Sequence, residues 1–369
     1  FNYTQQGDTV VSHCDRTFTG WYHTDEVKSS DWGCFSAMKV DSNPLIPATN
    51  EHKVQPFSAQ NDEVFKNDHT YIQKLNEIAK KNGWEAAAYP WMEGMKVSEL
   101  QRISGRKVEP WRRDALKRTT KLIKSLKSKR MQAKSRVQVP ESWDWSNVDG
   151  VNYVSPVRDQ KHCGSCYAFA TMGMMEARVR IASKNKDQTI FSPQDIVGCS
   201  KYSQGCDGGF PYLIGKYAED FGLTAEQCDP YLGEDSKCFN TCPASTKRLY
   251  GVNFQYVGGF YGASDEQNMM EEIYLNGPVV IGFEVYPDFR YYKKGVYKHT
   301  AAMKALNDPH DPKPWEEVNH AVLITGWGVT PDTNEKYWIV KNSWSDQWGN
   351  NGFFWILKGS DECGVESDV

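Results

Sequence analysis

The spacing of apolar residues changes along the chain and predicts helices first and strands later. Helical spacing begins after Asp68 and ends near Gly83. A second short helix is expected at 97–103, and a longer one at 166–183. Runs rich in β-branched and aromatic residues predict strands at 279–285, 321–325, 337–341 and 352–357.

The order of these elements predicts an α+β fold for the C-terminal part. From Val139 the composition is that of a globular enzyme, with a helix-rich half first and a strand-rich half after about Tyr250. Two such halves suggest two lobes with a cleft between them.

The part ahead of Val139 has a different character. Residues 1–40 read as short strands and turns with Cys14 and Cys34, and they are too few to hold a core alone. Residues 112–136 are strongly basic. We favour a solvated, flexible linker there, open to proteolysis, over an amphipathic helix.

Charge and hydropathy exclude some functions. The chain has 369 residues and a formal net charge of -4, which gives no reason to propose a nucleic-acid partner. No apolar run approaches the ~18 residues of a membrane span. The chain starts at Phe1 without a signal-peptide pattern, so we expect that its N-terminus has been lost. Asn2 opens a glycosylation sequon, which is weak support for secretion.

Most of the ten cysteines lie after Cys163. Zinc sites need paired short spacings, and Cys163–Cys166 has no second such pair. We therefore favour disulfides formed in an oxidising compartment.

The stretch Cys163-Gly-Ser-Cys166-Tyr167 carries most of the chemical information. Its second cysteine is expected to open a helix, where the dipole and free N–H groups favour a thiolate. A redox pair would follow a strand in a βαβ unit, which this context does not resemble. The stretch resembles the signature of the papain and cathepsin family of cysteine proteases, in which the second cysteine is the nucleophile.

The resemblance extends to the other catalytic positions. It implies that His320, in Asn-His-Ala-Val at a strand start, is the base, and that Asn342 orients its ring. Gln160 matches the glutamine that stabilises the oxyanion with the Cys166 N–H. His320 follows the cysteine by more than the family's ~130–150 residues, which we attribute to an insertion at 307–317 and extra loops earlier in the domain.

The resemblance also suggests substrate-binding positions. Gly208 and Gly209 match glycines that let an extended substrate approach, although a tight turn would also need them. Trp344 would shield the His320–Asn342 hydrogen bond and border the substrate.

Several stretches resemble the cathepsin C group of dipeptidyl peptidases within this family, among them Phe210-Pro211-Tyr212-Leu213-Ile214 and Trp32-Gly33-Cys34-Phe35. This likeness implies a papain-like two-lobed catalytic domain, with a helical lobe and a β-barrel-like lobe. Ahead of it lie a propeptide and the end of a small β exclusion domain. The implied boundaries are 1–41 for the exclusion domain, 42–138 for the propeptide with its basic linker, and 139–306 and 307–369 for the heavy and light chains.

The group's properties imply a zymogen that, once cleaved, releases dipeptides from free N-termini through a thioester acyl-enzyme. Expected partners are peptide and protein substrates, the propeptide as an intramolecular inhibitor, the missing exclusion-domain segment, activating proteases and a homotetramer. The implied location is a lysosome or related acidic vesicle, or secretion. A cysteine endopeptidase and an inactive papain-fold binding protein remain as alternatives.

The same likeness implies a chloride ion near Phe210, Tyr212 and Tyr256 and no organic cofactor or metal. Without this likeness, a plain aromatic core would be the preferred interpretation of these three residues. The implied disulfides leave out Cys363, and Cys14 and Cys34 would pair with the missing piece or with each other. They join Cys163 to Cys206, Cys199 to Cys238 and Cys228 to Cys242.

Two positions depart from the family pattern. Ser345 stands where glycine is common, and Asp368 stands where the pocket for the second substrate residue is closed by an aliphatic side chain. We expect Asp368 either to favour basic or polar substrate side chains or to point into solvent.

Overall fold

The computed structural model describes most of the chain from Val64 onward, within the unit that extends from Asp62 to Val369. The described residues are 64–103, 137–238, 242–243, 246, 248–307 and 319–369. The predictions for Asn2, Cys14, Cys34, the basic run 112–136 and nearly all of the insertion at 307–317 lie outside them.

The first described part, residues 64–103, is called the docked segment below. Its helix α1 (His69–Ala79) begins at Asp68, whose side chain accepts hydrogen bonds from the backbone N–H groups of Thr70 and Tyr71. A 3₁₀ turn, η2 (Lys80–Asn82), follows, and Gly83 ends it with a φ of 86°. The predicted helix is confirmed. The segment continues through β1 (Trp84–Ala86), η3 (Pro90–Met92) and α2 (Val97–Arg102).

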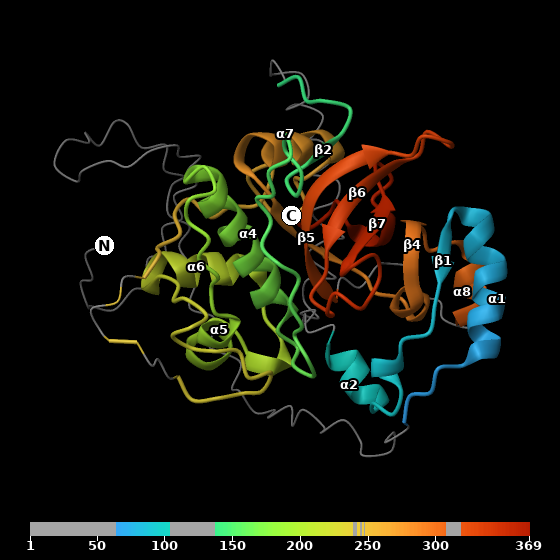
Figure 1. Ribbon diagram of the computed structural model, residues 1–369, viewed down its shortest axis with the longest axis horizontal. Helices are drawn as coiled ribbons and strands as arrows, with labels where there is room; N and C mark the ends of the chain where they lie inside the picture. Colours follow the sequence, from blue (N-terminus) through green and yellow to red (C-terminus); the bar gives the residue numbers. More distant parts are fainter. Residues whose placement is uncertain (1–63, 104–136, 239–241, 244–245, 247, 308–318) are drawn as a thin grey trace, which may run out of the picture. The chain divides into compact units, whose positions relative to one another are not determined.

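The helical lobe is built around α4 (Cys166–Ala182), which begins where the sequence predicts. Helices α5 (Pro193–Cys199) and α6 (Pro211–Phe221) pack beside it, with the turn η4 (Gly205–Asp207) between them in sequence. On its other side α4 lies against strand β5 of the second lobe (Figure 1). Because α4 has neighbours on both sides, most of its residues are buried.

The second lobe is a 7-stranded sheet with the order β1-β4-β7-β6-β5-β2, and β3 pairs with β5 beside this path (Figure 1). All pairs are antiparallel except β4 with β7. The strands are β2 (Trp143–Asp144), β3 (Val279–Phe283), β4 (Tyr292–Tyr297), β5 (His320–Val329), β6 (Lys336–Lys341) and β7 (Phe353–Leu357). Shorter helical elements complete the lobe: α7 (Glu266–Asn276), η5 (Pro287–Tyr291), α8 (Ala301–Asn307) and η6 (Glu362–Gly364).

The four predicted strands are confirmed, but β5 is longer than expected. Its last residues, from Gly326 onward, pair with β6 and with β2, which lies far away in sequence. The expected α+β fold with a helical and a strand-rich lobe is present. Two separate apolar cores support the lobes, one around α4 and α6 and a larger, aromatic-rich one beneath the sheet.

The docked segment extends the sheet. Its strand β1 pairs with β4, and the backbone of Gly83 lies so close to Gly295 that a Cβ at residue 295 would lie 2.2 Å from the Gly83 oxygen. Tyr89 adds a second attachment, since its hydroxyl donates to the Tyr292 carbonyl and accepts from the Gly349 N–H. The segment therefore packs as part of the strand lobe.

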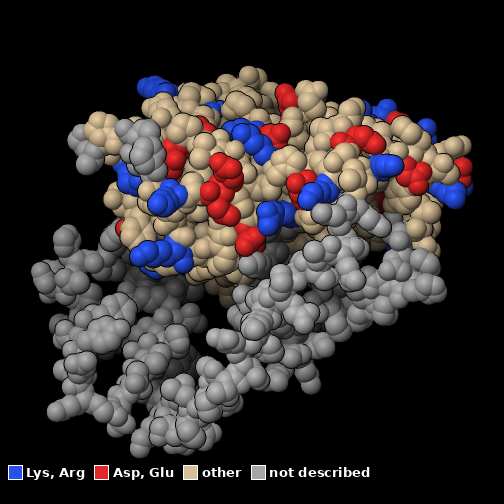
Figure 2. All heavy atoms as spheres, turned by 90° about the horizontal axis from the view of Figure 1, so that it is seen from below, with Lys and Arg blue, Asp and Glu red and all other residues tan. Residues whose placement is uncertain are grey.

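The surface is of mixed charge. On the face shown in Figure 2, Lys and Arg alternate with Asp and Glu across the described residues. Among the described helices, none is both long and apolar enough to cross a membrane.

Candidate active site

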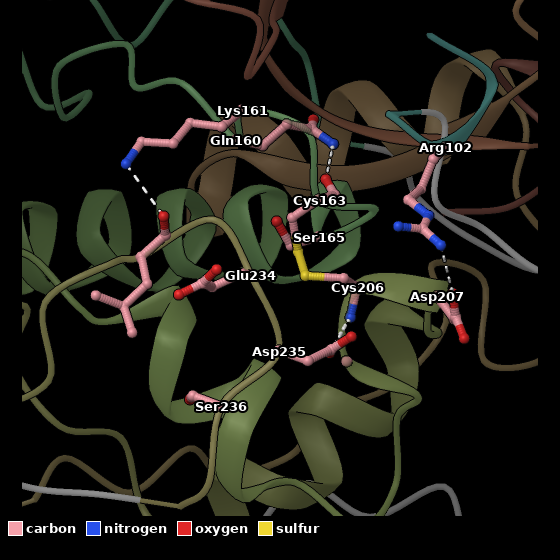
Figure 3. The surroundings of a disulfide bond; sticks show 12 residues. Arg102, Gln160, Lys161, Cys163, Ser165, Cys206, Asp207, Glu234, Asp235 and Ser236 are labelled. Atoms are coloured by element: carbon pink, nitrogen blue, oxygen red, sulfur yellow. Dashed lines mark hydrogen bonds and ion pairs between the residues drawn. A yellow bond between two sulfur atoms is a disulfide. The ribbon is translucent and has the colours of Figure 1, made fainter. Parts of the chain in front are cut away.

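Cys166 is the first residue of α4 and is fully buried. It forms no disulfide, whereas Cys163 is bonded to Cys206, so neither the zinc pair nor the redox pair considered for Cys163 and Cys166 exists. Figure 3 shows this disulfide between the loop that precedes α4 and η4. The first turn of a helix offers N–H groups without helical partners and a positive dipole end, which favour a thiolate.

His320 and Asn342 form the second half of the site. The Asn342 Oδ1 lies 2.9 Å from His320 Nε2 and also accepts from the Ser343 backbone N–H at 2.8 Å. Because this oxygen can only accept, Nε2 carries the proton and Nδ1 is the basic nitrogen. Among the described residues, Nδ1 has no hydrogen-bond partner. Nδ1 is thus the atom that can exchange a proton with a thiol.

Aromatic rings cover the imidazole. The Trp344 ring stacks on His320 with 4.9 Å between centroids, and Phe283 lies beside it. This burial lowers the pKa of His320 to about 4, while the Asn342 hydrogen bond opposes the change. The shielding role predicted for Trp344 fits this packing.

Hydrogen bonds fix both the side chain and the backbone of Gln160. Its Oε1 accepts from the Ser343 hydroxyl at 2.6 Å, and its backbone N–H donates to the Ser343 carbonyl. Its Nε2 donates to the Cys163 carbonyl at 2.9 Å and to the Ile103 carbonyl at 2.8 Å. The sequence analysis missed Ser343, although it stands between the predicted positions Asn342 and Trp344.

The docked segment therefore reaches the site. The Ile103 carbonyl accepts from the amide that the sequence assigns to the oxyanion, and Ile103 itself is buried. Arg102 lies 3.6 Å from Asp207, as Figure 3 shows, and Glu99 lies 3.8 Å from His162. The Arg102–Asp207 ion pair is largely exposed, so it contributes little to stability.

Gly208 and Gly209 are buried at the end of η4. A Cβ on Gly209 would lie 2.6 Å from the Tyr167 ring, whose hydroxyl donates to the Gly205 carbonyl. The ring alone thus requires glycine at 209, and a contact with substrate is a further hypothesis. Ser345 has a φ of 68°, in the left-handed region that costs a serine about 1 kcal/mol, which explains why glycine suits this position.

The other predicted positions lie together near the chain end. Tyr212 and Tyr256 stack with ring centroids 4.6 Å apart, and Phe210 is the residue before α6. Asp368 is buried, so the expectation that it points into solvent is wrong. Its carbonyl accepts from the Gly282 N–H of β3, and the adjacent Val369 carbonyl accepts from Val257. This pairing holds the carboxyl-terminal residues between β3 and the Tyr256 loop.

All three predicted disulfides are present, Cys163–Cys206, Cys199–Cys238 and Cys228–Cys242, and Cys363 forms none.

Behind the site lies a charged layer that the sequence analysis missed. The Lys341 ammonium donates to the carbonyl and the hydroxyl of Ser155, and Arg158 pairs with Glu176 of α4. Burial lowers the pKa of Lys341 to about 8. A cavity of about 20 Å³, lined among others by Lys341 and Asn342, has room for one water. These contacts tie β6 to the start of the catalytic domain.

Taken together, a cysteine at a helix start and a shielded His–Asn pair define a thiol-dependent hydrolase site. Comparison with family models agrees: residues 139–369 match the papain family cysteine protease model, and residues 1–39 match the cathepsin C exclusion domain. The chain belongs to the papain family of cysteine proteases.

Individual relatives support this assignment. Cathepsin C of Schistosoma mansoni is 43% identical over 81% of this chain and 64% of its own length, so the chain spans less than two thirds of that relative. A gut-specific cysteine proteinase of Caenorhabditis elegans is 34% identical over 63% of the chain and 72% of the relative. Among solved structures, procathepsin L 3 of Tenebrio molitor has a TM-score of 0.61 at 25% identity, covering 83% of this chain and 88% of that one.

The burial of His320 predicts that acid destabilises the folded protein. The pKa of His320 in the folded state, about 4, lies below the value of 6.5 expected in the unfolded chain. The stabilisation that His320 contributes is therefore complete above pH 6.5 and is lost as the pH falls toward 4. The loss should reach about 3 kcal/mol at most. The measurement is the pH dependence of Tm for Cys166→Ser, which prevents self-processing, against Cys166→Ser with His320→Gln.

The double variant should lose less stability between pH 7 and pH 4 than the single variant. Parallel Tm curves for the two proteins would contradict the role of His320.

Proposed function

We propose that this chain is the precursor of a cysteine peptidase that removes dipeptides from the free N-termini of peptides. The observation that carries the peptidase assignment is the His320–Asn342 hydrogen bond, which leaves Nδ1 as the basic nitrogen in a site that also contains Cys166 and Gln160. A catalytically inactive binding protein would have no need for this protonation pattern.

The proposed reaction has two steps. The Cys166 thiolate attacks the scissile carbonyl carbon, and the His320 imidazolium gives its Nδ1 proton to the leaving amine as the C–N bond breaks. His320 then takes a proton from water, whose oxygen attacks the thioester carbonyl as the C–S bond breaks, which releases the acid and restores the Cys166 thiolate and the His320 imidazolium. Gln160 Nε2 and the Cys166 N–H donate to the oxyanion in both steps.

Two observations favour dipeptide release over internal cleavage. Residues 1–39 match the exclusion domain of cathepsin C, and the Schistosoma relative carries that name. A domain that closes one end of the cleft limits the substrate to a free N-terminus. Endopeptidase activity is the alternative if this domain does not close the cleft.

The docked segment acts as the inhibitor in this proposal. The Ile103 carbonyl engages Gln160 Nε2 at 2.8 Å, and the amide cannot give the same proton to an oxyanion. Cleavage of the basic linker ahead of Val139 frees the segment, and a second cut near 301–317 separates the heavy and light chains.

The activity test uses a dipeptide amide and its N-acetylated form, before and after cleavage of the linker. We expect turnover only after cleavage and only with the free amine. Cys166→Ser should lower the rate by at least about a thousandfold and leave Tm unchanged.

Equal turnover of the acetylated substrate would favour an endopeptidase, and full activity before cleavage would refute the inhibitory role. Activity retained by Cys166→Ser would refute the nucleophile.

We further propose that chloride binds near Tyr212 and Tyr256. The donor set fits an anion, because α6 presents its N-terminus at Pro211 and Phe210 provides no side-chain cap there. Phenol O–H groups from the stacked tyrosines would complete the site. Chloride added to halide-free enzyme should raise activity several-fold, and Tyr256→Phe should weaken that response. Activity independent of chloride would contradict this proposal.

We propose that Asp368 selects basic side chains at the second substrate residue. Its burial beside β3 supports this, because a buried carboxylate favours a cationic partner. Asp368→Asn, which keeps the shape, should lower turnover of a Gly-Arg amide about tenfold, the value of one charged hydrogen bond, and spare a Gly-Phe amide. An equal loss of turnover for both substrates would contradict this role of Asp368.

A further inference from the structure

We propose that Tyr231 is a positioning residue that fixes the two oxyanion donors, the Gln160 amide and the Cys166 N–H, relative to each other. This inference rests on the proposed peptidase function. Tyr231 lies in the loop between α6 and α7, outside the segments that carry the catalytic residues. Its hydroxyl lies 2.7 Å from the Gln160 carbonyl and 2.6 Å from the Ser165 hydroxyl.

The direction of these two hydrogen bonds follows from the groups involved. The Gln160 carbonyl can only accept, so the single phenol proton of Tyr231 goes to it. Ser165 must then donate its own proton to the Tyr231 oxygen. One hydroxyl thereby connects the residue that supplies the side-chain donor with the residue immediately ahead of Cys166.

Ser165 occupies the N-cap position of α4, where a serine commonly accepts a hydrogen bond from the first turn. Here its side chain makes no such capping bond, because it is directed to Tyr231. The first turn of α4 therefore receives no side-chain oxygen from its cap. Its positive end stays available to the oxyanion, the charge that the reaction develops there.

Tyr231 is itself well supported. Its backbone N–H donates to Glu226 at 2.8 Å, and its ring meets the Phe169 ring of α4 edge-on at 4.7 Å. It also packs against the Cys163–Cys206 disulfide, near which Figure 3 shows Gln160 and Ser165. Burial raises the pKa of Tyr231 above its ordinary value, so the phenol keeps its proton throughout the working range.

The ring of Tyr231 makes the packing contacts and the hydroxyl makes the bridging hydrogen bonds, so a substitution can remove one without the other. Tyr231→Phe should keep the packing on Phe169 and the disulfide while removing both bridging hydrogen bonds. A displacement of about 1 Å in a catalytic group can cost ~100-fold in rate, so the variant should lose between about tenfold and a hundredfold in kcat. KM should change by less than about threefold, since no substrate contact is removed.

The test compares two reactions of Cys166 in the activated enzyme. Turnover of a dipeptide amide develops an oxyanion, whereas alkylation by iodoacetamide does not. Tyr231→Phe should therefore lower kcat with the amide, while its alkylation rate across pH stays within about twofold of the unsubstituted enzyme. Tyr202→Phe is the matched control, because it removes a phenol bonded to Asp220 in the same lobe and should change neither rate.

Ser165→Ala removes the hydrogen bond between Ser165 and the Tyr231 hydroxyl and provides a second variant if Tyr231→Phe folds poorly. The double variant should be no slower than Tyr231→Phe, since both changes remove one connection. Unchanged kcat in both single variants, or an equal fall in turnover and alkylation, would overturn the positioning role. Unsubstituted enzyme that alkylates but does not hydrolyse any amide would overturn the proposed function as well.

Discussion

The contact between α4 and β5 sets the geometry on which the site depends. Cys166 begins α4 and His320 begins β5, so the packing of this helix on this strand places the proposed nucleophile relative to the proposed base. Gly173 permits the close approach, because a Cβ there would lie 3.2 Å from the Leu323 side chain. Ala321 of β5 accordingly lies in the same apolar core as Cys166, so a change that separates the lobes would separate Cys166 from His320.

Rigid supports surround that contact on several sides. Lys341 and Ser155 fasten β6, Trp344 covers the imidazole, and Ser343 holds the Gln160 amide in one orientation. The cover over His320 leaves its Nδ1 without a hydrogen-bond partner among the described residues. This arrangement is the preorganisation that catalysis of acyl transfer requires, since the donors need not reorganise when charge develops.

In the proposed function, inhibition and catalysis use the same hydrogen-bond donor. The Gln160 amide binds Ile103 when the segment is docked and would bind the oxyanion during turnover. The extended sheet, through β1 and Tyr89, holds the segment in place.

The sequence by itself determined the local elements and the chemical identities. The cap at Asp68, the break at Gly83 and the start of α4 at Cys166 follow from local rules, and the motif around Cys166 specified the chemistry. Only the tertiary structure decided the rest: the length of β5, the burial of Asp368, the need for glycine at 209 beside Tyr167, and the bridge through Tyr231. These features arise between residues that are distant in sequence, and periodicity carries no information about which distant segments meet.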